Sequence, residues 1–180
     1  IYSTVCQLGY VTMALALGSA LGVAGGLMHF VNHMMLKDLL FLCAGCIMVA
    51  SHATTLDELG GLGRRMPITF AIFLFAGLSL AGVPPLMGFM AKYSVLASVL
   101  ATGQLWLTIA AVLFSLIGAF YYLRVVKVMY FDQPPANASR IEAPFGVKVL
   151  MSANGLAIAA LGLFPQTLMS LCAFSLLRSL

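Results

Sequence analysis

The chain has 180 residues, 62% of them apolar, and carries only 9 Lys and Arg and 5 Asp and Glu residues. Soluble domains carry about 25% charged residues, so this composition, with a mean hydropathy of +1.07, excludes a soluble globular protein. The apolar residues suffice for about five helical membrane spans of about 20 residues each. Runs such as residues 72–80 and 105–117 lack the alternation of a transmembrane β-strand. We therefore predict an all-α polytopic membrane protein.

The net charge of +4 comes from loops and from the ends of apolar segments, without the basic and aromatic stripe that follows a nucleic-acid backbone. We expect the lipid bilayer, and no nucleic acid, as a partner. The four cysteines lie in or beside apolar runs, where they serve as small packing residues. Because neither a four-cysteine cluster spacing nor a dinucleotide-binding fingerprint is present, we expect no cofactor and no metal on this chain.

Five apolar segments follow one another, and we predict that they form one transmembrane unit over residues 1–180. The expected spans are about 3–19, 27–50, 67–100, 105–131 and 147–163. A polar loop with three of the seven prolines, residues 132–144, separates the last two. Because the chain begins without methionine and without a signal peptide, we expect it to be a piece of a longer protein.

The third segment, residues 67–100, is longer than a straight crossing requires and contains Pro84 and Pro85 between Gly82 and Gly88. Two prolines remove backbone donors and clash with the preceding turn, so one continuous helix is excluded. Irregular backbone is tolerated in a membrane only where it lines a cavity or is buried in protein. The sequence therefore predicts a broken helix with a polar site near its midpoint.

The distribution of basic residues decides whether this segment crosses once or twice. With one crossing, the two basic loops fall on the same side, and the uncharged turns at 18–26 and 101–104 fall on the other. Two crossings would divide the basic residues between the sides. We therefore predict a multi-pass membrane protein with one broken crossing and both basic loops in the cytoplasm. The deciding residues are Arg64, Arg65, Arg124, Lys127, Arg140 and Lys148.

Lys92 follows the second proline by two helical turns and is flanked by apolar residues. An ionisable group inside a membrane is costly and is a functional candidate by default. Poor hydration disfavours the charged ammonium, which would allow this lysine to load and release a proton. The alternative is that Lys92 lies near the end of its span and extends its amine to the membrane surface.

His29, His33 and Lys37 are spaced four apart and form one polar stripe on a helix. Histidines pass protons readily near neutral pH, so this stripe predicts a proton relay. Two alternatives stay open: a metal site, which lacks a suitable third ligand, and simple hydrogen bonds to neighbouring helices. Asp38 points about 100° away from Lys37, so both cannot face one cavity squarely.

The stretch LSLAGVPPLMGFMAK, residues 78–92, resembles the broken helix and midplane lysine of the antiporter-like membrane subunits of respiratory complex I and of Mrp cation/proton antiporters. The stretch HFVNHMMLK, residues 29–37, is similar to the preceding helix of the L-type and M-type subunits of complex I and of the D-type Mrp protein. The stretches 113–131, 152–156 and 163–166 look most like the C-terminal part of the subunit N branch of bacterial NADH-quinone oxidoreductases.

The resemblance implies a subunit of about fourteen helices in two inverted repeats that translocates protons within a multi-subunit complex of a bacterial inner membrane. This chain would supply the last helices and would be a non-redox part of an NADH:quinone oxidoreductase. By position, Lys92 would gate the exit half-channel, while His33 and Lys37 would lie on the central polar axis. Gln7 would be a hydrogen-bonding link. Asp38 stands where the family usually has a small residue.

Two alternatives remain at this point. A cation/proton exchange module of the D-type Mrp class would use the same residues but would be driven by an ion gradient. A truncated or chimeric chain would insert and pack without transporting anything.

Overall fold

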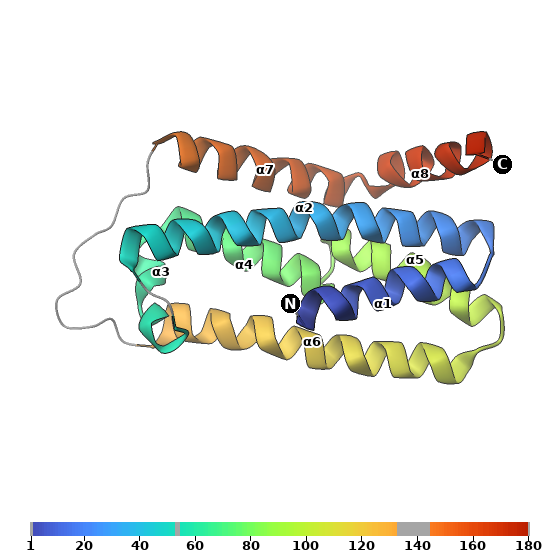
Figure 1. Ribbon diagram of the computed structural model, residues 1–180, viewed down its shortest axis with the longest axis horizontal. Coiled ribbons are helices and arrows are strands. Elements are labelled where there is room, and N and C mark those ends of the chain that lie inside the picture. The colour runs from blue at the N-terminus through green and yellow to red at the C-terminus, as the bar shows by residue number, and fades with distance from the viewer. Residues whose placement is uncertain (1, 53–54, 133–144, 180) are drawn as a thin grey trace.

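The computed structural model describes residues 2–52, 55–132 and 145–179, and every regular element in these ranges is helical. The long helices lie side by side along one axis (Figure 1). Two of them, α2 and α6, are each long and apolar enough to cross a membrane unaided. The predicted all-α membrane fold is confirmed. In chain order the elements are α1 (Tyr2–Ala16), α2 (Ala20–Ser51), η1 (Asp57–Leu59), α3 (Leu62–Arg65), α4 (Pro67–Ala81), α5 (Met87–Ala101), α6 (Leu105–Phe131), α7 (Phe145–Leu163) and α8 (Pro165–Ser179).

The central helix is α2, which packs against α1, α4, α5, α7 and α8. It begins after Ser19, whose hydroxyl accepts a hydrogen bond from the Gly22 amide at 3.0 Å and so caps the first turn. A Cβ at Gly26 would lie 2.8 Å from the Cβ of Ala14, so the absence of a side chain lets α1 and α2 approach closely. The small residues at the start of α2 therefore serve helix packing.

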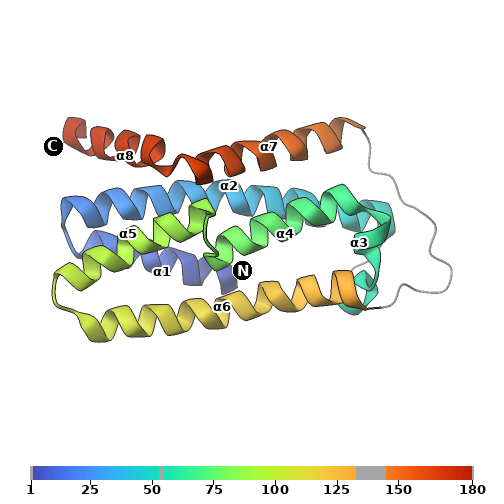
Figure 2. The ribbon, with the colours of Figure 1, turned by 180° about the vertical axis from the view of Figure 1, so that it is seen from behind.

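Together α4 and α5 run once along the bundle, with α4 starting beside α3 and α5 ending at the turn into α6 (Figure 2). Gly82 ends α4 with a φ of +92°, a conformation that glycine adopts without a steric penalty. The Pro84–Pro85 peptide is cis, and α5 starts at Met87. The predicted helix break at the two prolines is confirmed, and the single membrane crossing stays a prediction.

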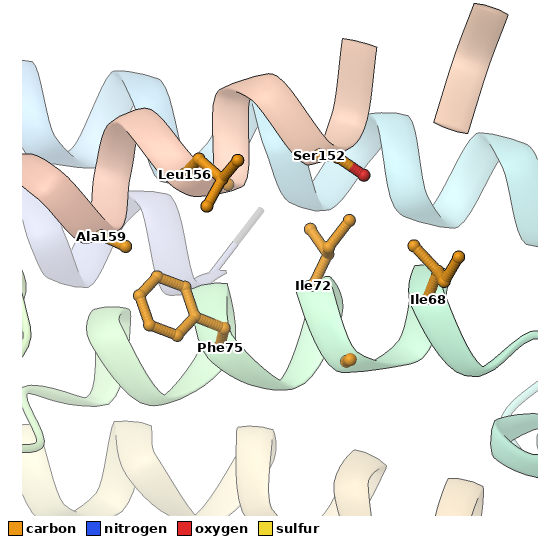
Figure 3. A pocket seen from close by; sticks show the side chains of 8 residues that line it. Ile68, Ile72, Phe75, Ser152, Leu156 and Ala159 are labelled. Carbon is orange, nitrogen blue, oxygen red and sulfur yellow. The ribbon is translucent and has the colours of Figure 1, made fainter. Parts of the chain in front are cut away.

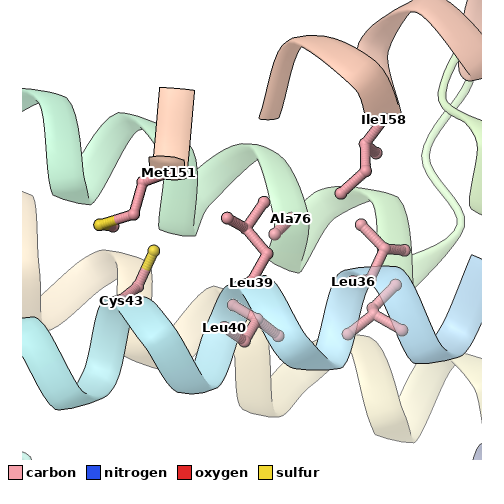
Figure 4. Packing of buried hydrophobic residues seen from close by; sticks show 8 residues of the cluster. Leu36, Leu39, Leu40, Cys43, Ala76, Met151 and Ile158 are labelled. Atoms are coloured by element: carbon pink, nitrogen blue, oxygen red, sulfur yellow. The ribbon is translucent and has the colours of Figure 1, made fainter. Parts of the chain in front are cut away.

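A buried apolar cluster holds α2, α4 and α7 together on one side of the break (Figure 4). On the other side, a second cluster joins α2 to α5 and α8 through Met28, Met87, Ala91 and Cys172. The bundle is therefore packed tightly above and below the break. The first cluster consists of Leu36, Leu39, Leu40, Cys43, Ala76, Leu80, Met151 and Ile158.

The C-terminal segment differs from the expectation, because sequence patterning assigned no element after residue 163. Here α8 follows α7 after Phe164, and the two helices are bent by 80° from each other. Pro165 occupies the first position of α8, where its missing N–H costs nothing. Because polar residues are interspersed in α8, its sequence does not form a long apolar run. Most of the polar loop, including Arg140, lies outside the described residues.

Replacing Gly88 by alanine should destabilise the bundle, because the new Cβ would lie 1.7 Å from the backbone oxygen of Ser79. We expect Gly88→Ala to lower the free energy of unfolding by about 2 kcal/mol or more, since overpacking forces the backbone to shift. Gly118→Ala is the matched control, because nothing lies within 4 Å of a Cβ at Gly118. Thermal denaturation in detergent checks this, and equal melting temperatures for the two variants would contradict it.

Candidate functional site

The helix break leaves two backbone carbonyls without their helical donors. In an uninterrupted α-helix, the carbonyls of Leu80 and Ala81 would accept from the amides four residues later. Those positions are Pro84 and Pro85, which carry no N–H. An unsatisfied carbonyl in apolar surroundings costs as much as a lost hydrogen bond, so both carbonyls need donors from elsewhere.

Lys92 supplies donors to both carbonyls. Its Nζ donates to the oxygen of Leu80 at 2.8 Å and to that of Ala81 at 3.2 Å. The side chain is only 6% exposed, so Lys92 does not extend to the membrane surface in this bundle. A Cβ at Gly82 would lie 3.2 Å from Cδ of Lys92, so this glycine also makes room for the lysine.

The third N–H of the Lys92 ammonium is directed to α6. Nζ lies 2.9 Å from the hydroxyl oxygen of Ser115, which accepts this hydrogen bond. The ring of Tyr10 on α1 lies beside the amine, with 5.6 Å between Nζ and the ring centroid, which is within the range of a cation–π interaction. The Tyr10 hydroxyl donates to the backbone oxygen of Ala111 at 2.6 Å. All three N–H bonds of a charged Lys92 are thus satisfied.

Gln7 joins this centre to the polar stripe of α2. Its Nε2 donates to the oxygen of Leu80 at 3.3 Å, so Gln7 and Lys92 share one acceptor. Its Oε1 accepts from Nε2 of His29 at 3.0 Å. The His29 ring also packs against Tyr10, with 5.5 Å between the ring centroids. The structure therefore brings three of the predicted residues, Gln7, His29 and Lys92, into one hydrogen-bonded group.

Three buried residues of α2 carry polar atoms that have no hydrogen-bond partner in the described part of the chain. They are Nδ1 of His29, both polar atoms of the Asn32 amide, and Nε2 of His33. Asn32 is 1% exposed and His33 is 6% exposed. Buried polar groups are rarely left unsatisfied in proteins, so this side of α2 is chemically suited to hold water.

Asn32 lies level with the helix break. One helical turn before it, Met28 packs with Met87 at the start of α5. One turn after it, Leu36 belongs to the same buried cluster as Leu80 at the end of α4. Residues four apart share a helix face, so the Asn32 position faces the irregular segment between α4 and α5.

Lys37 and Asp38 are not part of the hydrogen-bonded group of Gln7, His29 and Lys92. Lys37 is half-buried and continues the stripe one turn beyond His33, whereas the Asp38 side chain is exposed. Asp38 borders a separate groove on the outer side of α2 with Phe41 and Leu42. Within the described ranges, no ion pair joins Lys37 to Asp38, in line with the divergent directions of neighbouring helical residues.

A groove of about 440 Å³ between α4 and α7 offers no comparable chemistry (Figure 3). Ser152 is its single polar lining side chain, and no titratable group borders it. Among the described residues, no group of three His, Cys, Asp or Glu side chains could hold a metal ion. The residues that line the groove are Ile68, Ala71, Ile72, Phe75, Ser152, Gly155, Leu156 and Ala159.

Sequence reasoning missed three residues of this centre, namely Tyr10, Asn32 and Ser115. A usable indication existed for Ser115, which is the one polar residue between Thr108 and Tyr121 in a long apolar segment. Asn32 could have been noticed because it lies between the two histidines of the stripe. Nothing in the sequence distinguishes Tyr10 from the tyrosines that anchor helices at a membrane surface.

The comparison with protein families agrees with this geometry. Residues 1–118, which include the break, Lys92 and the α2 stripe, match the family model described as NADH:quinone oxidoreductase/Mrp antiporter, TM. The chain belongs to this family.

Relatives named NADH-quinone oxidoreductase subunit N align with most of the chain. The protein from Herminiimonas arsenicoxydans is 44% identical over 188 residues, covering 99% of this chain and 38% of the relative. The protein from Azoarcus sp. (strain BH72) is 54% identical over 127 residues, covering 71% of this chain and 26% of the relative. The chain thus spans less than two fifths of the length of these relatives.

Solved structures of this architecture include a subunit of the Mrp complex from Dietzia sp. DQ12-45-1b, with a TM-score of 0.83 and 24% identity over 93% of this chain and 39% of that chain. The membrane-bound sulfane sulfur reductase, an archaeal respiratory membrane complex, contains a chain with a TM-score of 0.80 and 32% identity over 89% of this chain and 27% of that chain. Respiratory complex I from Thermus thermophilus contains a chain with a TM-score of 0.80 and 22% identity over 96% of this chain and 37% of that chain.

Gln7→Leu should destabilise this family member, because it removes the hydrogen bonds to the Leu80 oxygen and to His29. We expect the free energy of unfolding to fall by about 1–3 kcal/mol, the cost of leaving a buried polar group unsatisfied. Gln104→Leu, at an exposed position before α6, is the control. Melting temperatures in detergent measure the effect, and a Gln7→Leu protein as stable as the control would refute the link.

Proposed function

We propose that this chain is the C-terminal part of a proton-translocating, antiporter-like subunit of an NADH-quinone oxidoreductase in a bacterial inner membrane. The names of the aligned bacterial relatives support this assignment. The observation that carries it is the buried lysine at a broken transmembrane helix, connected through Gln7 to a buried histidine. The chain itself would contribute no redox cofactor, and its partners would be other membrane subunits of the complex.

The proton path in this proposal runs along α2 and ends at Lys92. Protons would enter from the side of Lys37 and His33 and move along water held by the unpartnered atoms of His33, Asn32 and His29. Gln7 would hold the His29 ring in place by accepting from its Nε2. Lys92 would then load the proton and release it outward, and charge changes in neighbouring subunits would time the release.

Cation/proton exchange of the Mrp type is the second candidate, because the family description covers both classes. The same residues would carry it, with an ion gradient in place of electron transfer as the driving force. A chain that packs without transporting is the third outcome that the experiments below distinguish.

Lys92→Met in the full-length parent protein should abolish NADH-driven acidification of inverted membrane vesicles, because methionine cannot carry a proton. NADH oxidation with an artificial acceptor should persist, since this chain takes no part in electron transfer. Lys127→Met, an exposed lysine at the end of α6, is the control and should leave acidification intact.

If NADH-driven acidification survives Lys92→Met, the assignment to a redox-driven pump fails. Acidification driven by a sodium or potassium gradient in the same vesicles would then indicate the exchange function. Wild-type vesicles that show neither NADH-driven nor ion-gradient-driven acidification would indicate a chain without transport activity.

Asn32→Leu should separate stability from transport. Leucine has a similar shape, and removing a buried amide without partners should leave the melting temperature unchanged or raise it. NADH-driven acidification should fall, because water would lose two of its binding atoms along the path. Asn154→Leu on α7, at a half-buried position away from the stripe, is the control. Normal acidification in the Asn32→Leu protein would show that Asn32 does not contribute to the proton path.

A further inference from the structure

We infer that Ser115 is the relay residue through which Lys92 releases its proton. This inference rests on the proposed function of Lys92 as a proton carrier. Three acceptors surround the Lys92 ammonium, and they differ in whether they can pass a proton on.

Two of the three acceptors are backbone carbonyls. The oxygens of Leu80 and Ala81 can accept a hydrogen bond, but they carry no proton that they could pass on. They hold the lysine and satisfy the broken end of α4. A proton that moved toward either carbonyl would have no onward route through it.

Ser115 is different because a hydroxyl both accepts and donates. Its oxygen lies 2.9 Å from Nζ, which is hydrogen-bond distance for direct proton transfer. In the charged state the hydroxyl accepts from Lys92. In the neutral state the amine has two N–H bonds for the two carbonyls and one lone pair, and among its three partners only the Ser115 hydroxyl can donate to that lone pair.

Proton transfer from Lys92 through Ser115 needs only a water molecule as the final acceptor. One N–H bond of Lys92 breaks and its electron pair stays on Nζ, while the proton forms a new O–H bond at Ser115. At the same time the original O–H bond of Ser115 breaks, and that proton passes to a water molecule on the outward side. The product already has Ser115 donating to the neutral amine, so no side chain needs to rotate.

The surroundings of Ser115 give the step a direction. Tyr10 lies beside the Lys92 amine, and its hydroxyl donates to Ala111, one helical turn before Ser115 and closer to the start of α6. Lys92 is buried, whereas Ser115 on α6 is half-buried. The relay therefore leads from the core of the bundle toward α6.

The test compares two variants of equal size in the full-length protein within its complex. Ser115→Thr keeps the hydroxyl and Ser115→Val replaces it with a methyl group. Since a positioned proton-transfer group contributes about a hundredfold or more to a rate, we expect Ser115→Val to slow NADH-driven acidification by about tenfold or more and Ser115→Thr to stay within about twofold of wild type. Thermal denaturation and NADH oxidation with an artificial acceptor establish that both variants are folded and assembled.

The outcomes separate this inference from the proposed function. Loss of acidification in Lys92→Met with equal acidification in Ser115→Thr and Ser115→Val would overturn the relay and leave Lys92 as the carrier. Undiminished acidification in Lys92→Met would overturn the proposed function itself. If Ser115→Val does not assemble, Ser115→Ala provides the same comparison against Ser115→Thr, and normal acidification in Ser115→Ala would overturn the relay.

Discussion

Pro84 and Pro85 carry no amide hydrogen, and the rest of this structure depends on this constraint. The missing hydrogens leave two carbonyls at the end of α4 without donors, and lipid cannot supply any, so a donor must come from the protein. Lys92 meets this need with one side chain, and the carbonyls in turn stabilise its ammonium. The chain must fold back closely for this contact, which explains the absence of side chains at Gly82 and Gly88.

Several helices contribute to the centre, and no single one completes it. Besides α4 and α5, the helix α1 supplies Gln7 and Tyr10, α2 supplies His29, and α6 supplies Ser115. Apolar clusters on both sides of the break fix α2 against α4 and α5, so the polar atoms are held in register by packing. The geometry of the centre thus depends on the assembled bundle.

Sequence patterning predicted the helical class and the helix break, because apolar composition and the missing N–H of proline can be recognised in the local sequence. It also singled out Lys92, whose role in transport stays a prediction. It could not predict the partners of Lys92, since Ser115 and Tyr10 are distant in sequence and ordinary in composition. It also missed α8, whose polar residues lower its hydropathy. The residues of the predicted stripe on α2 differ in their contacts: His29 is hydrogen-bonded to Gln7, while Lys37 is not among the hydrogen-bond partners of Lys92 in the described part of the chain.

The contacts of Lys92 in the described residues are two carbonyls, one hydroxyl and one aromatic ring, with no carboxylate counter-ion among them. A buried carboxylate would hold the lysine in its charged form, and neutralising either member of such a pair would leave an isolated charge in the membrane. Dipoles impose no such penalty, because they carry no net charge that would be left unpaired when the amine becomes neutral. The dipoles around Lys92 can therefore accommodate both the charged and the neutral amine. Because they are buried with it, salt outside the bilayer screens their interaction with the amine only weakly.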